Sequence, residues 1–231
     1  MDPTETSFQF GCEDVGCVVE AVVFDLDGTL LDTLPDLILL TNAVLRECGF
    51  PERTPVEILS FVGNGVRALM YQAVPADAHE DTVEVAIQRW RELYPRYGHK
   101  LTKPYQDIPE ILAELKSQGL KLGVLSNKFD TGTKEVISSY LPRLFDVVHG
   151  ECAEIPRKPD PSGLLRTIKE LGTVPSRTIY VGDSPGDVVV SRNAGTYAVG
   201  VTWGYHHAES LYAVSPDRLI ANPKELLDLI Q

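Results

Sequence analysis

Short apolar runs alternate along much of the chain with longer stretches in which apolar residues recur at helical spacing. In one such stretch, Ile108 to Leu115, the helical repeat ends before Gly119, and a second runs from Leu164 to Leu171 and ends before Gly172. The apolar runs predict buried β-strands at 18–24, 120–126, 144–149, 178–182, 197–201 and 218–221. Because strands and helices alternate, we expect an α/β fold with a Rossmann-like parallel sheet.

Residues 34–103 depart from this pattern, because they separate the first two predicted strands and contain no convincing strand themselves. About 70 residues is longer than an ordinary connection between a strand and the next helix. We therefore predict an inserted all-helical cap domain at 34–103 and a catalytic core at 18–33 and 104–231. Three amphipathic stripes predict the helices of this cap domain; they are Leu37–Cys48, Val66–Ala73 and Val83–Tyr97. We interpret Trp90, Tyr94 and Tyr97 as part of the interior of the cap.

Composition narrows the function classes. A net charge of −12 disfavours nucleic acid and anionic membranes as partners, and no apolar run reaches the 18 residues of a membrane span. The acidic start lacks the apolar core of a signal peptide, so we interpret residues 1–17 as a flexible extension. The cysteines are few and irregularly spaced, which favours a reducing, cytoplasmic location; they are Cys12, Cys17, Cys48 and Cys152. The oligomeric state cannot be predicted from these features.

Candidate chemistry begins where the first strand ends, at Asp25 and Asp27. Strand alternation would place both carboxylates on one face, and Gly28 allows the chain to turn beside them. Two acids beside a glycine turn suit metal-assisted phosphoryl transfer, one as nucleophile and the other as proton carrier. The alternative is a simple Asp-Gly turn or a helix cap. That alternative fits Asp25 less well, since an acid that ends a buried strand needs a partner.

Three later sets of polar residues lie either directly after a predicted strand or in a loop stiffened by proline. Ser126 and Asn127 end the second strand, Lys158 precedes Pro159, and residues 183–187 follow the strand at 178–182. Each has a simple alternative explanation, such as a helix N-cap or a solvated lysine. Ligands of open parallel sheets bind where the carboxyl ends of the strands meet. Taken together, the groups favour one shared site.

Four segments resemble, in order and spacing, the signature motifs of the haloacid dehalogenase-like phosphohydrolases; they are 25–29, 126–127, Lys158 and 182–187. The resemblance covers roughly residues 20–225. Within the superfamily, the chain is most similar to the phosphoglycolate phosphatases. The segments that resemble the phosphoglycolate phosphatases in particular are 61–69, 158–161 and 201–205. The second acid, Asp27, argues against the dehalogenases themselves, which resemble this pattern without it.

The resemblance implies a Rossmann-like core with a mobile helical cap and a role for each site residue. Asp25 would be the nucleophile that forms an aspartyl-phosphate, and Asp27 the general acid and base. Mg²⁺ would be held by Asp25, the Asp27 backbone carbonyl and Asp183. The phosphoryl oxygens would be held by Ser126, Lys158 and the loop N–H groups near Gly28 and Asn127. Asp187 would orient Lys158 or a metal-bound water, and Thr29 would hydrogen-bond within its loop.

The organic part of a substrate must be recognised by the cap, since the core offers no obvious group for it. Gly63-Asn64-Gly65 forms a flexible turn before a predicted helix, and Arg67 lies in the first turns of that helix. A helix start offers free N–H groups and an arginine can bind a carboxylate, but a plain helix start with a solvated arginine fits equally well. We interpret His206 and His207 as surface residues, because Asp27 already fills the acid and base role.

These features predict a Mg²⁺-dependent phosphatase that acts on a small phosphorylated metabolite, with 2-phosphoglycolate as the first choice. A sugar-phosphate mutase is the second reading, because it uses the same aspartyl-phosphate. The third is a non-catalytic regulatory protein on this scaffold, which the intact set of Asp25, Asp27, Lys158 and Asp183 disfavours.

Overall fold

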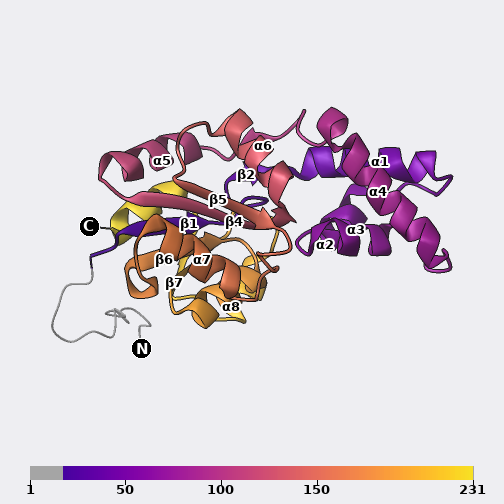
Figure 1. Ribbon diagram of the computed structural model, residues 1–231. Coiled ribbons are helices and arrows are strands. Elements are labelled where there is room, and N and C mark those ends of the chain that lie inside the picture. Colours follow the sequence, from indigo (N-terminus) through magenta and orange to yellow (C-terminus); the bar gives the residue numbers. More distant parts are fainter. Residues whose placement is uncertain (1–17, 231) are drawn as a thin grey trace.

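A six-stranded parallel sheet forms the centre of the core in the computed structural model, which describes residues 18–230 (Figure 1). Its order is β5-β4-β1-β6-β7-β8, so β1 lies inside the sheet. The strands are β1 (Ala21–Phe24), β4 (Lys121–Phe129), β5 (Val147–Glu151), β6 (Thr178–Gly182), β7 (Tyr197–Val201) and β8 (Arg218–Ile220). Phe24 pairs with Val124 on one side and Val181 on the other. The residues that follow these three strands therefore leave the sheet at one edge.

Helices cover both faces of this sheet, which confirms the predicted α/β class (Figure 1). Val22 and Phe24 belong to the apolar cluster that contains α5 (Ile108–Ser117) and α6 (Asp130–Tyr140). Ala21 and Val23 point to the other face, into the cluster of α7 (Ser162–Leu171) and α8 (Pro185–Ala194). Burial on both faces explains why β1 is a continuous apolar run instead of an alternating one. The other helical elements of the core, among the described residues, are α9 (Ala208–Tyr212) and the 3₁₀ segments Pro175–Arg177 and Pro223–Leu229.

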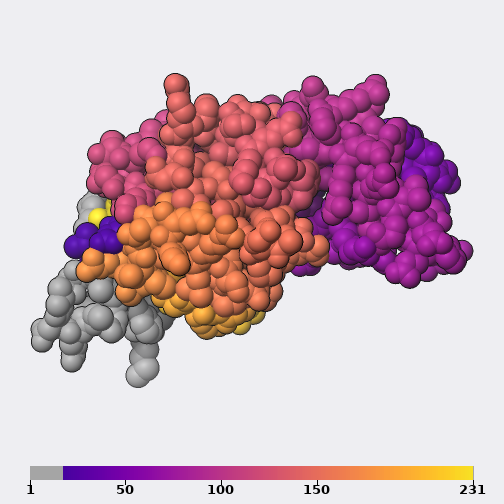
Figure 2. All heavy atoms as spheres, in the orientation of Figure 1, coloured from indigo at the N-terminus to yellow at the C-terminus, as the bar shows by residue number. Residues whose placement is uncertain are grey.

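Four helices form a separate lobe beside the core, coloured indigo to magenta in Figure 2. They are α1 (Leu34–Glu47), α2 (Pro55–Phe61), α3 (Gly65–Ala73) and α4 (Glu80–Tyr97). The short antiparallel pair β2 (Leu31–Asp32) and β3 (Lys103–Pro104) marks where the chain leaves the core and returns. Trp90 and Tyr94 are buried in this lobe, which we call the cap.

Helix α2 has no counterpart among the predicted helices, because its few apolar residues do not form a long stripe. Its start nevertheless carries a recognisable signal. The Thr54 side chain accepts a hydrogen bond from the Glu57 N–H, and the Glu57 side chain accepts one from the Thr54 N–H. This reciprocal capping box, followed by Pro55 in the first turn, is typical of helix N-termini.

Among residues 18–230, no helix is both long enough and apolar enough to span a bilayer. Cys48 and Cys152 are free thiols. The predicted extension at 1–17, with Cys12 and Cys17, lies outside the described residues.

A buried carboxylate joins the two connections between core and cap. Asp36, at the start of α1, is fully buried, and its carboxylate accepts hydrogen bonds from the N–H groups of Lys100, Leu101 and Thr102 at 2.6–3.0 Å. The Thr102 hydroxyl donates a further bond at 2.7 Å. Asp36 thereby holds α1, where the chain enters the cap, against residues 100–102, where it returns to the core. We call this junction, with the adjacent strands β2 and β3, the hinge.

Replacing Asp36 with alanine should lower the free energy of unfolding by about 3 kcal/mol, because buried N–H groups would lose their charged acceptor. Chemical denaturation followed by tryptophan fluorescence measures this change. Asp77→Ala, at an exposed position of the cap, is the matched control and should change stability by less than about 0.5 kcal/mol. Equal stability of the two variants would show that the Asp36 contacts contribute nothing.

Candidate active site

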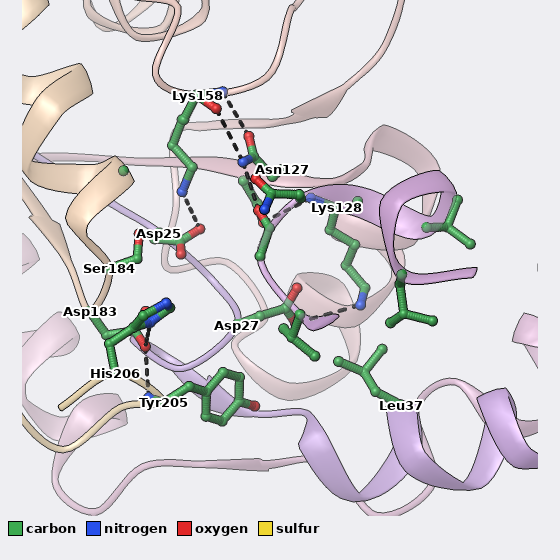
Figure 3. Close-up of a pocket in the computed structure, with 18 of the residues that line it drawn as sticks. Asp25, Asp27, Leu37, Asn127, Lys128, Lys158, Asp183, Ser184, Tyr205 and His206 are labelled. Carbon is green, nitrogen blue, oxygen red and sulfur yellow. Dashed lines mark hydrogen bonds and ion pairs between the residues drawn. The ribbon is translucent and has the colours of Figure 1, made fainter. Parts of the chain in front are cut away.

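A pocket of about 330 Å³ lies at the carboxyl edge of the sheet, where the cap meets the core. Four loops bring polar side chains to it, and several of these side chains are drawn in Figure 3. The residues that the core contributes include Asp25, Asp27, Ser126, Asn127, Lys128, Phe129, Lys158, Asp183, Tyr205 and His206. The cap contributes Leu37, Val62, Gly63, Asn64, Gly65, Val66, Leu69 and Trp90. Side chains predicted from separate motifs therefore share one pocket.

Lys158 lies between two buried carboxylates. Its Nζ is 2.7 Å from Asp25 Oδ1 and 2.7 Å from Asp187 Oδ1. Three effects together bring the pKa of Asp25 to about 8: burial raises it most, the charge of Lys158 opposes that rise, and the charges of Asp187 and Asp183 reinforce it. Burial alone would lower the pKa of Lys158, but the charges of Asp187 and Asp25 outweigh it and hold that pKa well above its usual value.

Asp187 uses both of its carboxylate oxygens on protein donors. Oδ1 accepts from Lys158 and from the Tyr180 hydroxyl at 3.1 Å. Oδ2 accepts from the N–H and hydroxyl of Ser184, the residue that caps helix α8. These contacts hold Asp187 against Lys158 and leave it little capacity for another ligand. That Asp187 orients Lys158 in a reaction stays a prediction.

Asp183 completes a cluster that suits a divalent cation. Asp25, Asp183 and Asp187 each place one carboxylate oxygen within 4.8 Å of the others. All three carboxylates are buried, and the one lysine in contact with two of them, Lys158, does not balance three acids, so the cluster carries excess negative charge. Buried charge of this kind requires compensation, and hard oxygen ligands favour a cation such as Mg²⁺. Because Asp187 is already saturated, Asp25 and Asp183 are the carboxylates best placed as ligands.

Two residues of the first loop support Asp183 instead of facing the pocket. The Thr29 hydroxyl donates to Asp183 Oδ1 at 3.3 Å. Gly28, at φ +88°, lies so close to Asp183 that a Cβ there would be 2.5 Å from Oδ2. The Gly28 N–H bonds the Leu31 carbonyl, so it is not directed at a phosphate. Glycine is required here for close packing against the acidic cluster.

Asp27 is hydrogen-bonded by a residue of the hinge, where the chain passes from the core into the cap. The Thr33 hydroxyl, at the N-terminus of α1, donates to Asp27 Oδ1 at 2.6 Å. Tyr205 then ties this hinge to the acidic cluster. Its hydroxyl accepts from the N–H groups of Thr33 at 2.7 Å and Leu34 at 2.9 Å, and its own N–H donates to Asp183 at 2.7 Å.

Asn127 connects the loop that carries Lys158 with the cap. Its Oδ1 accepts from the Lys158 N–H at 2.8 Å, and its Nδ2 donates to the Gly63 carbonyl at 2.8 Å. Arg157 makes a second connection, to the Asn64 carbonyl at 3.0 Å. The Gly63-Asn64-Gly65 turn therefore lies on the pocket, held by core side chains. Ser126 is buried in the pocket wall beside them.

Arg67 does not reach the pocket. Its guanidinium pairs with Glu84 at 2.6 Å and also contacts Tyr71, and its side chain is half exposed. His206, interpreted from the sequence as a surface residue, is instead partly buried on the pocket wall, with Nδ1 3.4 Å from Asp183. Hydrogen bonding to Asp183 raises the pKa of His206. His207 is exposed.

Lys128 is a second charged residue of the pocket that the sequence analysis did not place there. Burial would lower its pKa, but Asp27 and Tyr94 outweigh that effect and raise it, so the side chain is a buried cation. The apolar run predicted a strand that ended at 126, whereas β4 continues to Phe129. Strand alternation from Ser126 would have placed Lys128 on the same face and so in the site.

Comparison with known proteins agrees with this geometry. A profile of the family described as "Haloacid dehalogenase-like hydrolase" matches residues 22–201. A phosphoglycolate phosphatase of Aquifex aeolicus is 34% identical, with 92% of this chain and 97% of that protein aligned. An N-acetylmuramic acid 6-phosphate phosphatase of Pseudomonas aeruginosa is 35% identical over 92% and 95% of the two chains. The crystal structure of a protein described as a predicted phosphoglycolate phosphatase, from Haemophilus somnus 129PT, has a TM-score of 0.86 at 27% identity, covering 92% of this chain and 98% of that one. With the motifs, the fold and the relatives in agreement, the chain belongs to the haloacid dehalogenase-like hydrolases.

Proposed function

We propose that this protein is a Mg²⁺-dependent phosphatase that hydrolyses 2-phosphoglycolate through an aspartyl-phosphate intermediate. One observation carries the proposal: Asp25 lies buried against Lys158 in the same pocket as Asp27. A nucleophile beside a fixed cation, with a second acid nearby, is the arrangement that a phosphate ester requires. The relative from Aquifex aeolicus supports the choice of substrate.

The chemistry uses two displacements at phosphorus. In the first, an Asp25 oxygen forms a bond to phosphorus while the ester P–O bond breaks, and Asp27 gives its proton to the departing alkoxide. In the second, Asp27 takes a proton from water, whose oxygen attacks phosphorus and releases Asp25 and inorganic phosphate. Thr33 orients Asp27 for both proton transfers through its 2.6 Å hydrogen bond.

Lys158 and Ser126 would bind the transferring phosphoryl oxygens, with Lys158 held in place by Asp187 and Asn127. The carboxylates of Asp25 and Asp183 and the carbonyl of Asp27 would hold Mg²⁺. When bound, the ion supplies positive charge that offsets both the acidic cluster and the substrate phosphate. The contacts of Asn127 and Arg157 with the 63–64 turn hold this part of the cap against the pocket.

A second candidate substrate is N-acetylmuramic acid 6-phosphate, which the 35% identical relative from Pseudomonas aeruginosa supports. Both candidates join a phosphate ester to a carboxylic acid, and they differ in size. A phosphate-release screen over phosphorylated metabolites with Mg²⁺ separates them, and we expect phosphoglycolate to rank first. Isomer formation without phosphate release would favour the mutase, and no turnover of any ester would favour a non-catalytic protein.

The nucleophile has a direct test. Asp25→Asn should abolish phosphate release, because an amide does not attack phosphorus. Asp27→Asn should slow it by about 10²–10⁴, the usual contribution of general acid–base catalysis. Steady-state assays on variants with unchanged circular dichroism measure both effects. Full activity of Asp25→Asn, with deamidation excluded by mass spectrometry, would contradict the mechanism.

Binding of a divalent cation should release a proton from Asp25. With its pKa at about 8, this carboxyl is mostly protonated at pH 7 without the cation, whereas a metal ligand must be ionised. Roughly one proton should leave per cation at pH 7, and the number should fall as the pH rises through 8. Calorimetric titration of Mg²⁺ in two buffers of different protonation enthalpy counts these protons.

Two controls accompany this titration. Asp183→Asn should weaken Mg²⁺ binding, and a chelator should abolish phosphate release until Mg²⁺ is restored. Identical heats in both buffers would show that Asp25 is already ionised in the metal-free protein.

A further inference from the structure

One buried cation of the pocket takes no part in the chemistry proposed above. Lys128 extends from β4 with 4% of its side chain exposed, and it lines the pocket. In Figure 3 the end of its side chain lies on the same side of Asp27 as Leu37, whereas the Lys158–Asp25 pair lies on the other side of Asp27. A lysine buried in this way requires a reason, because desolvation of an ammonium group is costly.

The contacts of Lys128 within the protein leave it only loosely held. Its Nζ lies 3.5 Å from Asp27 Oδ1, longer than an ordinary charged hydrogen bond, and Thr33 already donates to the same oxygen at 2.6 Å. Its other neighbour is the ring of Tyr94, whose centroid is 5.2 Å away. An ammonium group has three N–H donors, so Lys128 keeps capacity for an acceptor in the pocket.

The position of Lys128 relates it to the leaving group. Asp27 protonates the departing oxygen in the proposed reaction, so the organic part of the substrate must lie beside Asp27 and therefore near Lys128. The surroundings are apolar: Phe129 packs against Tyr94 and Trp90, and Leu37 and Leu69 also line the pocket. A low-polarity wall strengthens the attraction between an ammonium group and a substrate anion.

We propose that Lys128 binds the carboxylate of the substrate's leaving group and so selects phosphorylated carboxylic acids over neutral phosphate esters. This inference rests on the proposed phosphatase function. In 2-phosphoglycolate a single methylene separates the ester oxygen from the carboxylate, which places that carboxylate close to the general acid. Arg67, for which the sequence left carboxylate binding and a solvated side chain equally open, is paired with Glu84 outside the pocket.

The test compares 2-phosphoglycolate with 2-hydroxyethyl phosphate, which has the same chain length and no carboxylate. Lys128→Met should raise KM for 2-phosphoglycolate by about 10- to 100-fold, the effect of losing a charged hydrogen bond. The rise in KM for 2-hydroxyethyl phosphate should be at least tenfold smaller than that for 2-phosphoglycolate, because this ester has no carboxylate for Lys128 to bind. Lys169→Met, at an exposed position of α7, is the matched control and should change neither substrate. Lys128→Arg keeps the charge and should keep the preference for 2-phosphoglycolate.

An equal fall in kcat on both esters would overturn the inference, because it would show that Lys128 only positions Asp27. A wild-type preference for 2-hydroxyethyl phosphate would overturn it as well.

A binding experiment separates this inference from the proposed function. In the Asp25→Asn background, where no turnover is expected, calorimetry gives the Kd of each ester with and without Lys128→Met. Selective weakening of 2-phosphoglycolate binding would support the inference even if the wild-type protein released no phosphate. Equal weakening of both esters, or of neither, would overturn it. Thermal unfolding identifies a misfolded Lys128→Met protein, and Lys128→Gln, which keeps a polar side chain of similar length, then replaces it.

Discussion

The buried contact of Lys158 with Asp25 and Asp187 is the constraint on which the rest of the site depends. Each of these charges would be costly to bury alone, so the three loops that carry them must meet at one point. Those loops follow β1, β5 and β6, and the parallel register of the sheet brings their starts to one edge. Asn127, from β4, then fixes the Lys158 backbone. The position of the nucleophile is therefore a property of the whole sheet.

The sheet and the core of the site could be predicted because each depends on short-range sequence patterns. Apolar runs locate the strands, and the acids, Ser126 and Lys158 follow them at points where parallel strands converge. Helix α2 was missed because its signal is a capping pair instead of an apolar stripe. The hinge strands β2 and β3 were missed because they are two residues each and pair across the whole cap.

The residues proposed to bind the organic part of the substrate were harder to predict from the sequence, because long-range contacts decide where their side chains point. Arg67 points away because Glu84, on a different helix, offers it a carboxylate. Lys128 points in because β4 continues past its apolar run and because Tyr94 of the cap provides an aromatic face for the ammonium group. Neither partner is close in sequence, so neither orientation can be deduced from local spacing. The proposed substrate specificity would thus depend on how the cap packs against the core.

Tyr205 has a thermodynamic consequence, because one residue joins the acidic cluster to the hinge. Its N–H restrains Asp183, and its hydroxyl restrains the backbone of Thr33 and Leu34, where the cap begins. A cation at the cluster and a movement of the cap therefore act on the two ends of a single side chain. Any coupling between them must be reciprocal: a cap position that favours cation binding is itself favoured, by the same free energy, when the cation is bound. In the proposed mechanism, Tyr205 would link occupancy of the cation site with enclosure of the substrate.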